Sequence, residues 1–286
     1  MSITIEGPMM PRYLVFTDLD GCLLDSQTYS FEAARPALER LQADHIPVVL
    51  VSSKTRAEIE PLRQQLDHQG PFIVENGGAV FVPIGTFAFP LERARRRAAY
   101  QVIELGTPYA MLRDVLKQIE ETVGTPLTGF GDLSIDDIMK LTGLPREAAL
   151  RAKLREYDEP YIVHGPTRIV EEVCRQIVTR GLQWTQGGRF FHLTGLNNKG
   201  QAALKLLHCY KRQWDLDGEQ SRVETVGLGD SLNDLPLLIA VDHPVLVQKP
   251  DGSYDHEIDL PRLIHAPGIG PVGWNHAILD LLKRAA

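Results

Sequence analysis

The sequence predicts an α/β protein that is built on a parallel sheet and divided by an inserted α+β unit. Three observations support this prediction: the length of 286 residues, the alternation of strand and helix patterns in the first and last thirds, and a change of pattern in the middle third. At roughly 150 residues per domain, this length suggests two domains. Hydrophobic residues make up 43% of the chain and charged residues 23%, which are globular values that argue against disorder or a coiled coil.

The first third alternates strand patterns of the buried type with amphipathic helix patterns. The strand patterns lie at 13–16, 47–51 and 72–74, and helical spacing of apolar residues separates them. The second helix is predicted to start at a capping box formed by Thr55 and Glu58. Strands that are joined by helices pair in parallel through right-handed crossovers, so we expect a parallel sheet.

The middle third mixes helix patterns with strands that read as antiparallel. The predicted elements are helices near 109–123, 134–142, 146–157 and 167–180, a strand near 160–164, and a hairpin of strands 182–186 and 189–193 around two glycines. The last third returns to the first style, with helices from Lys199, at 235–240 and at 274–284, and strands at 222–228 and 244–248. We therefore expect residues 1–83 and 196–286 to form one core, and residues 84–195 to form an inserted domain.

Charge and cysteine content exclude several classes of partner. The net charge of −7 provides no basic field for nucleic acid or an anionic membrane. The apolar runs are far shorter than the roughly 20 residues that span a bilayer, and the N-terminus lacks the layout of a signal peptide. The three cysteines are far apart and fit neither a disulfide framework nor a Cys-x-x-Cys metal site. We therefore expect a cytoplasmic protein with no nucleic-acid or membrane partner.

Polar residues follow the predicted strands and open the predicted helices in both outer thirds. These residues are Asp18, Asp20, Ser52, Lys199, Asp230 and Asp234. Ligands of open α/β sheets bind at the carboxyl edge, where such residues meet. Each also has an ordinary structural interpretation: a solvated Asp-x-Asp turn, a serine that caps the next helix, a solvated lysine in a first turn, and acids that favour a helix N-terminus. Their order and co-occurrence favour a catalytic site.

The same motifs resemble those of a known enzyme superfamily. In chain order they are Asp18-Leu-Asp20-Gly21, Ser52, Lys199 and Gly229-Asp230-Ser-Leu-Asn233-Asp234, and they resemble the four motifs of the haloacid dehalogenase-like (HAD) phosphohydrolases. The resemblance implies a Rossmann-like core. The inserted block lies where this superfamily carries a C2-type cap, which implies a small phosphorylated metabolite as substrate.

The resemblance implies a role for each motif residue in phosphoryl transfer. Asp18 would be the nucleophile that forms an aspartyl-phosphate, and Asp20 would protonate the leaving alkoxide and then activate water. Ser52 would donate a hydrogen bond to the transferring phosphoryl group. Lys199 would neutralise charge on the nucleophile and the phosphate.

A magnesium ion is the natural partner of carboxylate and phosphate oxygens. The ligands implied for Mg²⁺ are the carboxylates of Asp18 and Asp230 and the backbone carbonyl of Asp20. Asp234, and likewise Asn233, would orient the water ligands of the metal or Lys199 without binding the metal themselves. The nine histidines show no ligand spacing, so we expect no zinc site.

Further strings extend the resemblance over nearly the whole chain. They include Val51-Ser-Ser-Lys-Thr55, Glu75-Asn-Gly-Gly78, Arg155-Glu-Tyr-Asp-Glu-Pro160, Gly187-Gly-Arg-Phe190 and Gly270-Pro-Val-Gly-Trp-Asn275. These strings resemble the mannosyl-3-phosphoglycerate phosphatases, which hydrolyse mannosyl-3-phosphoglycerate to mannosylglycerate, a compatible solute. The implied substrate is a small anionic sugar phosphate that carries a phosphate, a carboxylate and a sugar.

Such a substrate needs cations and close backbone approach. We expect Lys54 and Arg189 to bind its anionic groups, since arginine can hold a carboxylate by two parallel hydrogen bonds. We expect Asn76, Gly77 and Gly78 to approach the ligand with backbone amides, which small residues permit. A surface arginine beside a turn and a plain hairpin turn remain the structural alternatives.

Other functions stay open at this point. Glucosyl-3-phosphoglycerate or another sugar phosphate would use the same chemistry. A phosphotransferase or mutase would use the same nucleophile, although Asp20 supplies a base for hydrolysis. A non-catalytic sugar-phosphate binder is expected to have lost one of the three key carboxylates, and all are present. Arg155 and Glu156 fit a solvated helix face as well as a site.

Overall fold

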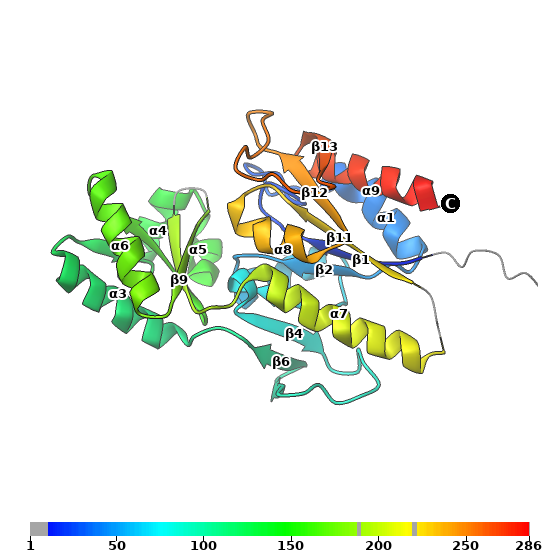
Figure 1. Cartoon of the computed structure of the whole chain (residues 1–286), viewed down its shortest axis with the longest axis horizontal. Coiled ribbons are helices and arrows are strands. Elements are labelled where there is room, and N and C mark those ends of the chain that lie inside the picture. The colour runs from blue at the N-terminus through cyan, green and yellow to red at the C-terminus, as the bar shows by residue number, and fades with distance from the viewer. Residues whose placement is uncertain (1–10, 188–189, 219–221, 286) are drawn as a thin grey trace, which may run out of the picture.

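The computed structural model of the chain describes residues 11–187, 190–218 and 222–285. It contains two sheets that lie side by side in Figure 1. The nine-stranded sheet runs, in spatial order, through β13 (Ile264–Ile269), β12 (His243–Gln248), β11 (Val223–Gly229), β1 (Arg12–Thr17), β2 (Val48–Val51), β3 (Phe72–Val74), β4 (Ala79–Pro83), β6 (Tyr100–Glu104) and β5 (Arg95–Arg97). The six strands from β13 to β3 are parallel, which confirms the predicted parallel sheet.

Helices cover both faces of this sheet. One face carries α1 (Arg35–Ala43), α2 (Arg56–Gln65) and α9 (Pro271–Ala285), and the other carries α7 (Lys199–Leu216) and α8 (Leu235–Ala240). In Figure 1 α1 and α9 lie together on the side of the sheet opposite α7. The predicted capping box is confirmed, because the side chain of Thr55 accepts from the Glu58 amide and Glu58 returns a bond to Thr55.

Strand β1 shows why both faces must be covered. Successive side chains of a strand point to opposite faces. Val15 packs in the apolar cluster under α1 and α9, while Leu14 and Phe16 pack in the cluster under α7. A strand that is apolar on both sides is typical of a parallel sheet buried between two helix layers. Trp274 of α9 is fully buried and donates its indole N–H to the Thr17 hydroxyl at 2.8 Å.

The chain after β4 departs from the expected start of the inserted domain at residue 84. Strands β6 and β5 continue the large sheet, with β6 antiparallel to β4 and β5 antiparallel to β6. The reason lies in β6, where Val102 packs on one face of the large sheet and Ile103 on the other. The chain therefore leaves the large sheet only after Glu104 and returns to it before Lys199.

The smaller unit is an antiparallel sheet with helices on both faces, as the mixed pattern of the middle third predicts. Its strands, in spatial order, are β7 (Leu127–Gly129), β8 (Asp158–Val163), β10 (Phe190–Thr194) and β9 (Gln183–Gly187). Helices α3 (Tyr109–Val123) and α6 (Thr167–Thr179) pack on one face, and α4 (Ile135–Thr142) and α5 (Arg146–Ala152) pack on the other. Helix α5 ends five residues before the predicted end at 157, which changes the environment of Arg155.

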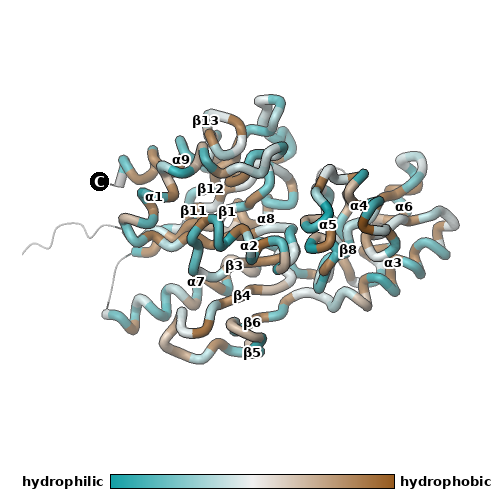
Figure 2. Tube along the Cα trace, turned by 180° about the vertical axis from the view of Figure 1, so that it is seen from behind, coloured by the Kyte–Doolittle hydropathy of each residue, from teal (hydrophilic) through white to brown (hydrophobic). Residues whose placement is uncertain are grey.

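The smaller unit contacts the core through α5 and the segment that follows it. Both views place α5 on the side of the unit that faces the core, and Figure 2 shows it next to α2. The hydroxyl of Thr55 lies 3.0 Å from the backbone oxygen of Arg151. Arg155 donates to the backbone oxygen of Ser53 at 2.8 Å. These contacts hold the smaller unit against the loop that follows β2. Within the described ranges, no helix is both long and apolar enough to cross a membrane.

Candidate active site

The predicted site residues of the core meet at one edge of the large sheet. Three of these residues directly follow the last residue of a strand: Asp18 follows β1, Ser52 follows β2 and Asp230 follows β11. The register aligns these ends, because Thr17 pairs with Leu228 on one side and with Leu50 on the other. The sheet therefore brings together residues that are up to 212 positions apart in the sequence.

Lys199 lies at the start of α7 and is completely buried. Its Nζ donates to Asp18 Oδ1 at 2.6 Å and to Asp234 Oδ1 at 2.5 Å. Burial opposes the ammonium charge, but the two carboxylates outweigh it and raise the pKa of Lys199. The alternative of a solvated lysine in the first turn is therefore wrong. This lysine is the fixed positive charge of an acidic centre.

The acidic centre consists of Asp18, Asp230 and Asp234. One carboxylate oxygen from each lies within 4.8 Å of the others. Burial and repulsion from Asp234 raise the pKa of Asp18 well above its usual value, although Lys199 opposes the shift. The same two causes raise the pKa of Asp230 to about 7. A cluster of hard oxygen donors with this much repulsion fits a divalent cation, which would offset the repulsion.

Asp234 and Asn233 lie where supporting residues are expected. Both oxygens of Asp234 are engaged, one by Lys199 and the other by the backbone amides of Asp230 and Ser231 at 3.0 and 3.3 Å. The hydroxyl of Ser231 lies 3.1 Å from Asp230 Oδ1 and 2.9 Å from Asn233 Oδ1. Asp234 therefore fixes the loop that carries Asp230.

Ser52 is 1% exposed, and its Oγ accepts from the Lys54 amide at 3.1 Å. It does not cap the next helix, since Thr55 holds that position. Asp20 contacts the side chain of Lys54, with Oδ2 at 2.8 Å from Lys54 Nζ. The other oxygen, Asp20 Oδ1, has no hydrogen-bond partner among the described residues. Asp20 thus presents one uncommitted carboxylate oxygen next to the centre.

Lys54 reaches the site as predicted, but its charge is shared. Besides Asp20, its Nζ lies 3.9 Å from Glu58 Oε1 and 5.1 Å from the ring centroid of Tyr29. Burial opposes the charge of this lysine, and the two carboxylates overcome it, so its pKa is raised. Lys54 is therefore already paired before any ligand arrives.

The loop 76–78 packs against the start of α7 and was expected to offer backbone amides to the ligand. The Gly78 amide donates to the carbonyls of Val74 and Glu75, so it is occupied within its own turn. Gly77 has φ +87°, and a Cβ there would lie 2.2 Å from the Asn198 carbonyl oxygen. Packing against the start of α7 thus requires a glycine, and none of these three loop residues lines the pocket described below.

Asn76 connects the two units. Its side-chain amide donates to Asp158 Oδ2 at 2.9 Å, and Asp158 also binds His192 Nδ1 at 2.9 Å. Glu75, completely buried beside it, accepts from the backbone amides of Glu156 and Tyr157. Burial is the main cause that raises the pKa of Glu75 to about 8. This loop therefore fastens the smaller unit to the core.

A pocket of about 280 Å³ lies between the core and the smaller unit. Asp20, Lys54 and Glu58 of the core line one wall. The residues of the smaller unit that line it are Phe130, Thr142, Leu144, Ala152, Arg155, Pro160, Phe190 and His192. The sequence interpretation did not identify Phe130, Phe190 or His192 as site residues. The predicted Arg189 lies outside the described residues.

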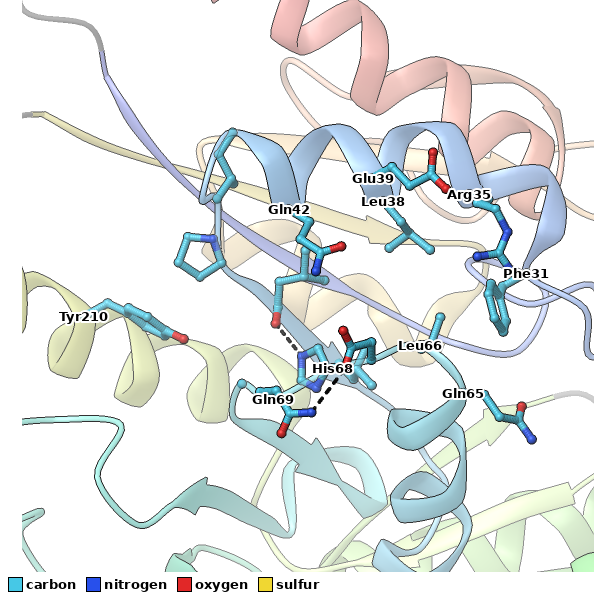
Figure 3. Close-up of a pocket in the computed structure, with 16 residues that line it drawn as sticks. Phe31, Arg35, Leu38, Glu39, Gln42, Gln65, Leu66, His68, Gln69 and Tyr210 are labelled. Carbon is cyan, nitrogen blue, oxygen red and sulfur yellow. Dashed lines mark hydrogen bonds between the residues drawn. The ribbon is translucent and has the colours of Figure 1, made fainter.

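A second cavity, of about 350 Å³, lies in the core between α1 and the loop after α2. Figure 3 shows His68 at its centre, within 2.7 Å of the Val48 carbonyl oxygen. Burial lowers the pKa of His68 to about 4. This cavity lies at the amino ends of β2 and β3, away from Asp18, and contains none of the predicted site residues. The pocket at the carboxyl edge is therefore the candidate substrate site.

The fold and the acidic centre together define a HAD-like hydrolase. The family model for haloacid dehalogenase-like hydrolases matches residues 15–86. A solved structure described as a HAD subclass IIB sugar phosphatase has a TM-score of 0.64 at 14% identity and covers 95% of this chain and 98% of its own. This likeness supports the same architecture of core and inserted unit.

Two relatives match at much higher identity. A glucosyl-3-phosphoglycerate/mannosyl-3-phosphoglycerate phosphatase of Methanococcoides burtonii is 48% identical over 96% of this chain and 98% of its own length. A protein of the same name from Persephonella marina is 39% identical over 95% of this chain and 97% of its own length. The chain belongs to the family of these phosphatases within the HAD-like hydrolases.

Proposed function

We propose that this protein is a phosphatase that hydrolyses mannosyl-3-phosphoglycerate to mannosylglycerate and phosphate. The observation that supports this most directly is the pair Asp18 and Asp20 at the end of β1, with Lys199 on Asp18 and one free oxygen on Asp20. A nucleophile and an acid–base group that are two residues apart suit a two-step transfer of a phosphoryl group.

In the first step a carboxylate oxygen of Asp18 attacks the phosphorus atom. The ester bond to the leaving group breaks, and Asp20 gives its proton to the leaving alkoxide. In the second step Asp20 takes a proton from water, which attacks the aspartyl-phosphate and releases inorganic phosphate. Lys199 offsets negative charge throughout, and Ser52 holds a phosphoryl oxygen.

We propose Mg²⁺ as the divalent cation of the acidic centre, held by Asp18, Asp230 and the Asp20 carbonyl. When bound, it supplies positive charge next to the phosphoryl oxygens. Asp234 keeps its supporting role, since its oxygens already bind Lys199 and two backbone amides. The three cysteines are buried and unpaired, which supports a place for the protein in the reducing cytoplasm.

The glucosyl epimer is the second candidate substrate. It is favoured by the names of the two relatives, both of which include glucosyl-3-phosphoglycerate. Epimers differ in the position of one hydroxyl group, and a site that does not hydrogen-bond this hydroxyl accepts both.

The experiment is a substrate panel. Purified protein with Mg²⁺ is tested for phosphate release from mannosyl-3-phosphoglycerate, glucosyl-3-phosphoglycerate and simple hexose phosphates, with Asp18→Asn protein as the background. We expect kcat/KM for the mannosyl compound to exceed that of the hexose phosphates by about 100-fold or more. Equal values for all substrates would contradict the specific assignment, and the ratio of the two glycosyl compounds decides between one substrate and two.

A further inference from the structure

The pocket between the two units holds cations in two different states. Lys54 is paired with Asp20 at 2.8 Å and lies 3.9 Å from Glu58. Arg155, on the opposite wall, forms no ion pair with any carboxylate of the described residues; its hydrogen bonds go to backbone oxygens. Of the lysine and arginine side chains described as lining this pocket, Arg155 is thus the one with no carboxylate within ion-pair distance.

Two hydrogen bonds hold the guanidinium of Arg155 in place and leave its other N–H donors without a partner among the described residues. Its NH1 donates to the Ser53 carbonyl of the core at 2.8 Å, and its Nε donates to the Ala152 carbonyl at 2.8 Å. Its Cζ lies 5.4 Å from the ring centroid of Phe130, which lines the same pocket. Arginine carries five N–H donors in a planar fork, so three remain for a ligand.

A purely structural role for Arg155 would be to balance the buried acids around it. Burial disfavours its charge, and Asp158, Glu58, Glu75 and Glu159 together raise its pKa. Three of these acids, however, have close partners of their own. Asp158 binds His192, Glu159 binds Arg113 at 2.7 Å, and Glu75 accepts from two backbone amides. The acids therefore favour the charged form of Arg155, and three of its N–H donors remain available for a ligand.

We propose that Arg155 binds the carboxylate of the leaving group and so sets a preference for phosphomonoesters that carry a second anion. This inference rests on the proposed phosphatase function. The leaving group of mannosyl-3-phosphoglycerate carries a carboxylate close to the ester oxygen. Asp20, which protonates that oxygen, and Arg155 line the same pocket. A carboxylate matches the fork of an arginine through two parallel hydrogen bonds.

The test compares two substrates that differ only in the carboxylate. These are mannosyl-3-phosphoglycerate and its analogue in which the carboxylate is reduced to an alcohol. We expect Arg155→Gln to lower kcat/KM for the acid by about 100-fold and for the alcohol by less than about 3-fold. Arg155→Lys keeps the charge without the fork and is expected to lose about 10-fold on the acid alone.

The matched control is Arg151→Gln. It removes the same charge from the neighbouring helix α5, where Arg151 faces Glu147 at 3.8 Å and does not line the pocket. We expect this variant to keep the wild-type preference for the acid. Thermal unfolding of all variants identifies any loss of fold, and Arg155→Lys provides the answer if Arg155→Gln is not folded.

Two outcomes would overturn the inference: an equal loss on both substrates, which indicates a structural role, or an unchanged preference. If the wild-type protein hydrolyses neither compound, the proposed function fails separately. Calorimetric binding of 3-phosphoglycerate and glycerol 3-phosphate then decides the inference. We expect the wild type to bind 3-phosphoglycerate about 10-fold or more tightly than glycerol 3-phosphate, and Arg155→Gln to bind both equally. Equal binding to the wild type would exclude the proposed role of Arg155.

Discussion

The two polar centres of this protein differ in how their charges are balanced. In the acidic centre, Lys199 is completely buried and binds two carboxylates at 2.5 and 2.6 Å. In the pocket between the units, Arg155 binds two backbone carbonyls and keeps the rest of its fork free. The first arrangement suits a group that is the same in every substrate, the phosphoryl group. The second suits the part of a substrate that differs from one enzyme to the next.

The centres also differ in how the chain builds them. Asp18, Ser52 and Asp230 follow strands of one sheet, so the register of that sheet fixes their positions. Arg155 and His192 come from the smaller unit and reach the pocket only because that unit is fastened to the core. The geometry of the chemical step therefore depends on the sheet, and the geometry of the leaving-group site depends on the contact between the two units.

The largest expected effect concerns the acidic centre. Asp18→Asn removes the nucleophile, and we expect the rate of phosphate release to fall by about 10⁴-fold or more. The amide also relieves the repulsion that raises the pKa of Asp18, so in the absence of metal the thermal stability should stay equal or rise. Phosphate release and thermal unfolding check both parts. Retained activity would exclude Asp18 as the nucleophile.

The next effect concerns the contact between the units. Burial raises the pKa of Glu75 to about 8 in the folded protein, against 4.5 for the free side chain. The folded protein therefore holds this proton more tightly, and the stabilisation is lost as the pH rises from about 4.5 to about 8. The Glu75→Gln variant mimics the protonated form, so it should keep this stabilisation as the pH rises.

We therefore expect the free energy of unfolding of Glu75→Gln, relative to the wild type, to increase by several kcal/mol across this range and to level off above it. Urea unfolding at a series of pH values measures the difference. Glu58→Gln is the control, since Glu58 is a partly buried acid of the core that also accepts from a backbone amide, that of Thr55. A difference between Glu75→Gln and the wild type that does not change with pH would contradict the assignment.

The smallest expected effect is the stabilisation by Mg²⁺, which should depend on the acidic centre and not on Arg155. Binding of Mg²⁺ to the folded protein alone should raise the free energy of unfolding by about 2.7 kcal/mol at a metal concentration 100 times the dissociation constant. Asp230→Asn should abolish this gain, while Arg155→Gln should keep it. Thermal unfolding with and without Mg²⁺ measures the gain. A gain that survives in Asp230→Asn would place the metal elsewhere.

The acidic centre was accessible from the sequence because its residues occupy local motifs. Each of Asp18, Ser52, Lys199 and Asp230 lies at a strand end or a helix start, and such positions follow from apolar patterns alone. The parallel order of the strands then brings them together. The capping box at Thr55 followed from the same local rules.

The leaving-group wall was not accessible in this way. The pattern near 146–157 suggested one helix, and Arg155 then fitted a solvated face. In the structure α5 ends at Ala152, and the segment after it lies on the core. That end depends on contacts with Ser53 and Glu75, residues about 80 to 100 positions away, which no local pattern contains. The same cause explains β5 and β6, whose place is set by pairing with β4.

Strand β5 has a consequence for the behaviour of the protein at high concentration. It is the last strand of the large sheet, and its three residues, Arg95–Arg97, are all arginines. An edge strand offers unpaired backbone groups to any neighbouring strand, which is how sheets join into aggregates. A second copy that approached this edge would bring two such strands of arginines together, with Arg95 paired to Glu104 and Arg97 to Glu156 in each copy and no such pair formed by Arg96 among the described residues. The positive charge of β5 thus disfavours pairing of this edge with another strand. Replacing the arginines by neutral residues should therefore favour aggregation.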